Sequence, residues 1–83
     1  MNQQEGGRVD IKIHMVEDET TTIVHTVLDL RGDHFESTGE AHRSPDDPPM
    51  PVVGEELAVA RALQDLAAQL IEAAQAKFEA FSG

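Results

Sequence analysis

One stretch near the C-terminus, residues 54–81, constrains the fold most, because it has the pattern of a single long amphipathic helix. Neither Gly nor Pro occurs between Glu55 and Phe81, and alanine is frequent, so helix propensity is high throughout. Spacings of three and four place the apolar residues on one face, which is expected to pack against the rest of the chain. These residues are Leu57, Ala60, Leu63, Ala67, Leu70, Ile71, Ala74, Phe78 and Phe81.

Both ends of this predicted helix carry boundary signals. Pro51 and Gly54 precede it, and Glu55 and Glu56 fall in its first turn, where the helix dipole favours negative charge. The terminal Ser82-Gly83 offers a stop.

Three short strands are predicted before the helix. Residues 8–16 alternate between apolar and polar side chains, residues 20–30 are rich in β-branched residues, and residues 34–43 form a weaker third strand. Charged or glycine-containing turns at 17–19 and 31–33 connect them, so an antiparallel meander is expected.

The alternation also predicts which side chains share a sheet face. The small residues of the third strand would let the alanine-rich helix approach closely, which predicts a two-layer α+β fold of β-β-β-α order. Residues 1–7 are expected to be a flexible tail, residues 8–83 a single domain, and the proline-rich residues 44–53 an extended connector. The face toward the helix is predicted to carry Ile11, Val24, Thr26, Gly39 and Ala41.

The size of the chain points to a homodimer. With 83 residues and no cysteine, it can build only a small core without disulfides. A helix of about 27 residues is roughly 40 Å long, whereas strands of about nine residues span roughly 30 Å. Either the helix breaks near Gln75, or a second subunit covers its last turns with Phe78 and Phe81. Ile23 and Val27 on the open sheet face are further candidates for a partner surface.

Charge excludes several functions. The chain has 6 Lys and Arg against 16 Asp and Glu, a formal net charge of −10 at pH 7. Such a chain repels polyanions, so autonomous nucleic-acid binding and attachment to an anionic membrane are disfavoured. Neither a signal-peptide pattern nor a membrane-spanning apolar run is present in the sequence, and the cytoplasm is the expected location.

Residue chemistry does not indicate an enzyme, and no cofactor or metal is expected. There is no cysteine, the serines lie in no nucleophile motif, and no glycine-rich loop leads from a strand into the helix. The four histidines fall on the open sheet face, where a solvated or dimer-facing surface is favoured over a pH-sensitive or metal-binding one. Arg31-Gly32-Asp33 spells an adhesion tripeptide, but a hairpin turn explains it better. Arg61 and Asp65 are expected to form an i,i+4 pair, or else to contact the sheet, the connector or another subunit.

The start of the helix resembles the signature of a known family. The run from Gly54 to Leu66 resembles the pattern G-[DE]-E-L-x-x-A-R-A-L-x-D-L of a small actinobacterial family of unknown function with a fold like that of double-stranded-RNA-binding domains. Residues 9–13 resemble its first strand, and residues 39–41 and 44–47 its third strand and following loop, where the family usually has Asn-Pro rather than Ser-Pro. The signature positions here are Gly54, Glu56, Leu57, Arg61, Leu63, Asp65 and Leu66.

The resemblance implies a three-stranded sheet, a long C-terminal helix, dimers, and an association with hypoxic or dormancy responses. Some members resemble ribosome hibernation factors. The chain differs from true double-stranded-RNA binders, which use an N-terminal helix and a basic cluster, because only seven residues precede its first strand and Glu55-Glu56 are acidic. A shared fold does not by itself imply a shared activity.

Two functions of different kinds follow from these patterns. The first is a non-catalytic, dimeric cytoplasmic protein that acts through protein surfaces in stress or dormancy. The second is a ribosome-associated or RNA-binding factor, which would need Arg8, Lys12, Arg31, His42 and Arg43 in one patch. A ligand-binding sheet face around Ile23 and Val27 is a third possibility.

Overall fold

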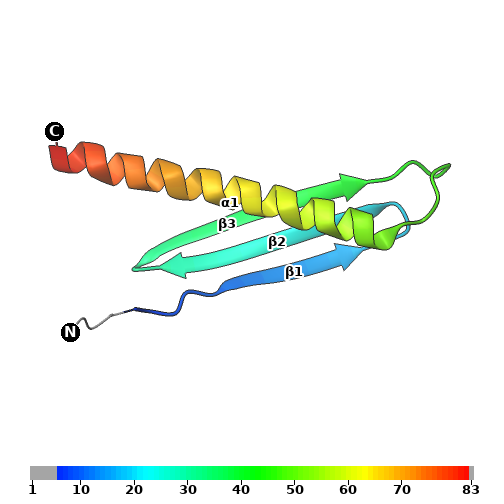
Figure 1. The fold of residues 1–83 in the computed structure, drawn as a ribbon, viewed down its shortest axis with the longest axis horizontal. Coiled ribbons are helices and arrows are strands. Elements are labelled where there is room, and N and C mark those ends of the chain that lie inside the picture. Colours follow the sequence, from blue (N-terminus) through cyan, green and yellow to red (C-terminus); the bar gives the residue numbers. More distant parts are fainter. Residues whose placement is uncertain (1–5, 83) are drawn as a thin grey trace, which may run out of the picture.

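A computed structural model describes residues 6–82 as three strands followed by one helix (Figure 1). The strands form one antiparallel sheet in the order β1-β2-β3. The predicted α+β meander with a long C-terminal helix is confirmed, and residues 1–5 of the predicted tail lie outside the described residues. The elements are β1 (Ile11–Glu17), β2 (Thr21–Leu30), β3 (Asp33–His42) and α1 (Pro51–Ser82).

The strand pairing keeps the predicted faces but changes the predicted partners. Ile11 lies opposite Leu28, and Val24 lies opposite Gly39. Turns centred near residues 18–19 and 32–33, as the sequence predicts, would align His14 with Ile23. The structure instead pairs His14 with His25, because the first turn is centred one residue later. The second turn is centred one residue earlier, so each strand is displaced by two positions, which leaves every side chain on its predicted face.

The turn between β2 and β3 is a two-residue hairpin loop. Arg31 and Gly32 have φ values of 50° and 89°, the left-handed backbone that two-residue hairpins require at both positions. Glycine adopts this conformation without a steric cost. The hairpin geometry therefore accounts for the glycine of the Arg-Gly-Asp tripeptide.

Helix α1 packs on β2 and β3, and in the described part of the chain its backbone does not approach β1 (Figure 1). Its buried residues are Ala58, Ala62 and Leu66, spaced by four. The predicted sheet-facing stripe is wrong, because most of its members are exposed and point away from the sheet. Among them are Leu57, Leu63, Ile71, Phe78 and Phe81.

The reason is a close approach between α1 and β3. A Cβ atom on Gly39 would overlap the carbonyl oxygen of Ala58 and the amide nitrogen of Ala62, and would lie 3.0 Å from the Cα of Ala62. Beside this contact the Ser37 hydroxyl donates to the Ala62 carbonyl (2.7 Å), and the Thr26 hydroxyl donates to Ser37 Oγ (2.5 Å). Larger side chains at the contact would separate the helix from these buried hydroxyls.

The helix begins earlier and runs longer than predicted. Pro51, placed in the connector by the sequence, is its first residue, which proline tolerates because first-turn amides have no helical partner. With 32 residues the helix is about 48 Å long, whereas strands of 10 residues span about 33 Å. It continues without a break past Gln75, and its C-terminal turns extend beyond the sheet (Figure 1).

The contact at Gly39 predicts a large effect from one methyl group. Gly39→Ala should lower the free energy of unfolding by about 3 kcal/mol, because the backbone of α1 must move away from β3. The measurement is urea unfolding followed by circular dichroism at fixed protein concentration. Gly7→Ala is the matched control, since nothing lies within 4 Å of a Cβ there. Equal stability of the two variants would refute the close approach.

Candidate functional site

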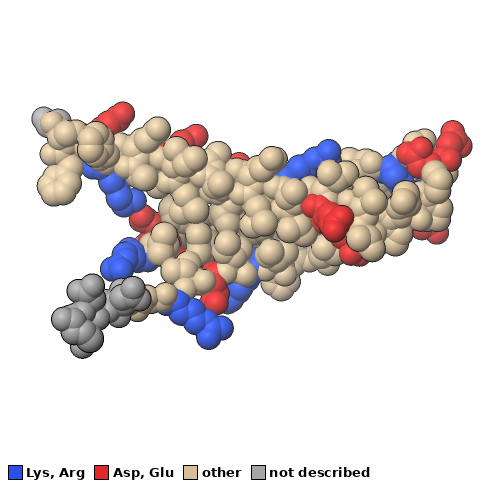
Figure 2. Space-filling model, viewed as in Figure 1, with Lys and Arg blue, Asp and Glu red and all other residues tan. Residues whose placement is uncertain are grey.

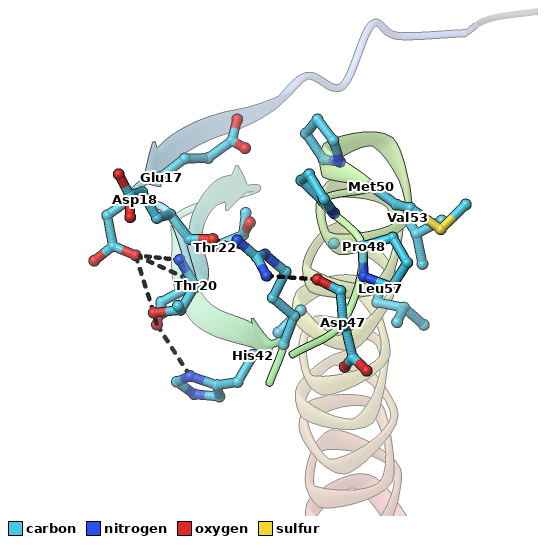
Figure 3. A pocket seen from close by; sticks show the side chains of 17 residues that line it. Glu17, Asp18, Thr20, Thr22, His42, Asp47, Pro48, Met50, Val53 and Leu57 are labelled. Carbon is cyan, nitrogen blue, oxygen red and sulfur yellow. Dashed lines mark hydrogen bonds between the residues drawn. The ribbon is translucent and has the colours of Figure 1, made fainter. Parts of the chain in front are cut away.

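A pocket of about 620 Å³ opens where the β1–β2 turn, the end of β3, the connector and the start of α1 meet (Figure 3). One side carries carboxylates and hydroxyls of the turn, and the other carries apolar side chains of the connector and helix. Sequence analysis did not identify this pocket. Residues that define it include Glu17, Asp18, Thr20, Arg43, Met50 and Leu57.

Arg43 ties the two sides of the pocket together. Its Nε donates to the Glu19 carbonyl (2.8 Å), and its Nη1 donates to the carbonyls of Ser44 (3.1 Å) and Asp47 (2.9 Å). The guanidinium thus holds the turn and the connector in place. Because its partners are backbone atoms, no charge pattern in the sequence could have identified this role.

Asp18 organises the turn at the rim of the pocket. Its Oδ1 accepts hydrogen bonds from the amides of Thr20 (2.9 Å) and Thr21 (2.8 Å). These two bonds favour the charged carboxylate and hold the pKa of Asp18 below its ordinary value.

Glu17, at the end of β1, lies near Glu55 of α1. Because the helix begins at Pro51, Glu55 and Glu56 fall in its second turn, and their predicted place in the first turn is wrong. A hydrogen bond between the two carboxyl groups is the main cause that raises the pKa of Glu17, with smaller contributions from desolvation and charge repulsion. The pair is a point of repulsion between strand and helix when both groups are charged.

The polar groups of the pocket are engaged with one another and with the backbone. The Thr21 hydroxyl lies 3.1 Å from His42 Nδ1, and the Arg43 guanidinium is engaged by backbone carbonyls. One exposed hydroxyl–imidazole contact does not by itself define a nucleophilic site. Among residues 6–82, no group of three or more His, Cys, Asp or Glu is placed to hold a metal ion. Nothing in this pocket indicates catalysis.

The open sheet face carries a chain of histidine and carboxylate groups. Both ring nitrogens of His34 lie 2.6 Å from carboxylate oxygens, of Asp29 and Glu36, and His25 Nε2 lies 2.9 Å from Glu36. Two such contacts favour the doubly protonated ring, so the hydrogen bond with Glu36, followed by that with Asp29, raises the pKa of His34. The same contacts lower the pKa of Glu36, with His34 the larger cause.

Several polar residues of α1 bind β3 along its outer edge. Arg61 Nη1 donates to the Glu40 carbonyl (2.8 Å), and Gln69 Nε2 donates to the Glu36 carbonyl (2.8 Å). The expected Arg61–Asp65 pair is replaced by this contact to the sheet. Asp65 instead accepts a hydrogen bond from Gln69 (3.2 Å).

Of the other signature residues, some pack against the sheet and others are exposed to solvent. Leu66 is buried against the sheet, and a Cβ on Gly54 would lie 3.3 Å from Thr22 Oγ1. Glu56, Leu57 and Leu63 are exposed.

The four residues predicted to form a partner surface do not come together. Ile23 and the half-buried Val27 lie on the open sheet face, next to Glu40 and Glu36 of β3. Phe78 and Phe81 are 71% and 94% exposed on the helix turns that extend beyond the sheet.

A larger apolar surface lies on the helix side of the molecule. We call it the apolar flank: Leu63, Ala67, Leu70 and Ala74 of α1 with Ile11, Ile13 and Met15 of β1. The three β1 residues face the helix layer but are 43%, 45% and 39% exposed, because α1 leaves β1 uncovered. In Figure 2 much of this face is uncharged, with an acidic group inside it toward the start of α1 and other charged atoms nearer its ends and borders.

These features define a small two-layer α+β protein with a three-stranded meander and an exposed apolar flank. The Rv2632c-like family model matches residues 7–83, so the chain belongs to that family. The crystal structure of Rv2632c, a mycobacterial protein, is similar to this chain with a TM-score of 0.86 and 33% sequence identity. The similarity covers 95% of this chain and 94% of that one. No curated protein matches.

Among the described residues, no helix combines the length and the apolar character needed to cross a membrane.

The Glu17–Glu55 contact predicts a stabilising substitution. A raised folded pKa contributes stability below the ordinary value of 4.5, and this contribution is lost as pH rises through the folded value. Glu17→Gln should therefore melt at a higher temperature than the unsubstituted protein at pH 8, and the two should converge near pH 4. Glu19→Gln, in the same turn, is the control. An unchanged melting temperature for Glu17→Gln at pH 8 would contradict the contact.

The His34 contacts predict a pH-dependent stability. The contribution of His34 is complete below its ordinary pKa of 6.5 and is lost as pH rises through the higher folded value, whereas that of Glu36 is lost as pH falls below 4.5. Between pH 6 and pH 9 the melting temperature should fall, and His34→Gln should reduce this fall. His14→Gln on the same sheet face should keep the original slope. Identical slopes for all three proteins would exclude the network.

Proposed function

We propose that this protein is a non-catalytic cytoplasmic dimer that acts through protein–protein contacts. The observation that carries the proposal is the excess surface of the single chain. Its accessible area is 6649 Å², whereas a compact chain of 9.0 kDa exposes about 4,900 Å². Its radius of gyration is 17.2 Å, against about 12 Å expected for 83 residues.

The excess, about 1,700 Å² per chain, is large enough for a stable association, since standard interfaces bury about 1,600 Å² in total over both partners. Most of the exposed large apolar side chains lie on β1 and α1. Contiguous exposed apolar surface on a small protein is typical of an interaction site.

A role in stress or dormancy is part of the proposal and comes from the resemblance of the signature region. A small interaction protein suits such a role, because it needs no substrate and can act by binding a partner.

The alternative is a ribosome-associated or RNA-binding factor with a fold like that of double-stranded-RNA-binding domains. One observation favours it: Arg8, Lys12 and Arg31 lie toward the hairpin end of the sheet, since β1 begins opposite the end of β2. Three acids, Asp10, Asp29 and Asp33, share that end, and Arg8 pairs with Asp10 at 3.2 Å. Arg43 and His42 lie at the opposite end of β3, which weakens this alternative.

Three measurements test these functions. Light scattering should give twice the 9.0 kDa chain mass at micromolar concentration, and a folded particle of single-chain mass would overturn the dimer. Co-sedimentation with ribosomes across a salt series should show no binding even at low salt. Binding that disappears as salt rises would instead support the alternative. A pull-down from oxygen-limited cells should recover a reproducible protein partner, and recovery of none would count against the interaction role.

A further inference from the structure

We infer that a second copy packs its α1 antiparallel against α1 along the apolar flank and covers the exposed inner face of β1. The inference rests on the proposed dimer and assigns the surface and the direction of the contact. The resulting particle has the two helices side by side between two outer sheets.

The first observation is that the sheet is wider than one helix can cover. Strands lie about 4.8 Å apart and a helix is about 10 Å across, so one helix covers two strands. Helix α1 lies over β2 and β3, and the inner face of β1 is left with Ile11, Ile13 and Met15 about two-fifths exposed. The uncovered strip is one strand wide, so a second helix beside α1 would cover β1 and extend beyond the edge of the sheet.

The second observation is the spacing on the side of α1 that borders this gap. Ala60, Ala67 and Ala74 repeat every seven residues, and Leu63 and Leu70 repeat between them. This is the spacing of two helices that pack along their length, and alanine at the repeat lets their axes approach to about 8 Å. These side chains are not among the buried residues of α1. The residues that α1 buries against the sheet are Ala58, Ala62 and Leu66.

Charge selects the antiparallel direction. Glu56 lies at the N-terminal end of the apolar side of α1 and Lys77 near its C-terminal end. Lys77 already pairs with Asp33 of its own chain (2.6 Å), but its ammonium group has further donors. An antiparallel partner brings its Glu56 next to Lys77 at both ends, whereas a parallel partner brings the two Glu56 carboxylates together. Ala67 lies midway between these ends, so the two-fold axis is expected to pass beside it.

The open sheet face is a less favourable binding surface for a second copy than the apolar flank. Its apolar residues Ile23 and Val27 lie opposite Glu40 and Glu36 in β3, and the His34 network occupies the adjoining rows. A second copy there would bury these carboxylates against its own, at a high electrostatic cost.

Cysteine cross-linking tests the axis directly, since the chain contains no cysteine. Ala67→Cys should oxidise to a covalent dimer at micromolar concentration, because an axis beside residue 67 brings the two Cα atoms within disulfide range. Ala68→Cys is the matched control: residue 68 is also exposed but lies on the polar side of α1 with Arg61 and Glu72, and the variant should remain uncross-linked.

A charge at the axis provides a second readout. Ala67→Glu should raise the dimer dissociation constant at least about 100-fold, because it places two like charges together, whereas Ala68→Glu should change it less than about threefold. Both positions are exposed in the single chain, so circular dichroism should show both variants folded.

The outcomes are distinguishable. A protein that is monomeric at all concentrations would overturn the proposed dimer and this arrangement together. A dimer that survives Ala67→Glu and does not cross-link through Ala67→Cys would overturn the arrangement alone, and would leave the proposed function standing.

Discussion

The direct contact between the backbone of α1 and Gly39 of β3 is the constraint on which the rest of the structure depends. It allows only small side chains at the crossing, so Ala58 and Ala62 face the sheet and the buried hydroxyls of Ser37 and Thr26 connect strand to helix. Once these alanines face inward, most of the larger apolar residues of the helix face outward, and Leu66 is the one large side chain of α1 that is buried against the sheet. The exposed surface is therefore a consequence of how the core is closed.

Because of the same contact, the helix covers one edge of the sheet, at β3, and leaves the other edge, at β1, uncovered. Arg61 and Gln69 donate to backbone carbonyls of β3, which is an edge strand and would otherwise be a template for pairing with another chain. At the other edge, within residues 6–82, α1 does not cover β1 and no strand pairs with its outer side. Association through the apolar flank would cover the inner face of β1 and the exposed leucines in one step. In this account the apolar residues that the single chain leaves exposed are also the residues that bind the second copy.

The sequence allowed the elements and the sheet faces to be predicted, because alternation in the strands and high helix propensity in residues 55–81 are local properties. The side of α1 that meets the sheet was not predictable in the same way, since both the Ala58–Ala62 side and the Leu63–Leu70 side are apolar. Gly39 was the available signal: a glycine inside a strand pattern indicates close backbone approach and should have favoured the alanine side. The pocket was missed because Arg43 is held by backbone carbonyls, which depend on how the turn and connector meet.

The most direct test of this account is the solvent exposure of individual alanine methyl groups in α1, measured by NMR with a soluble paramagnetic probe across a dilution series. The Ala58 and Ala62 methyl signals should remain protected at every concentration, whereas those of Ala67 and Ala74 should be protected only at high concentration and become exposed on dilution. Protection of Ala67 that does not depend on concentration, together with exposed Ala58 and Ala62 methyl groups, would contradict the account.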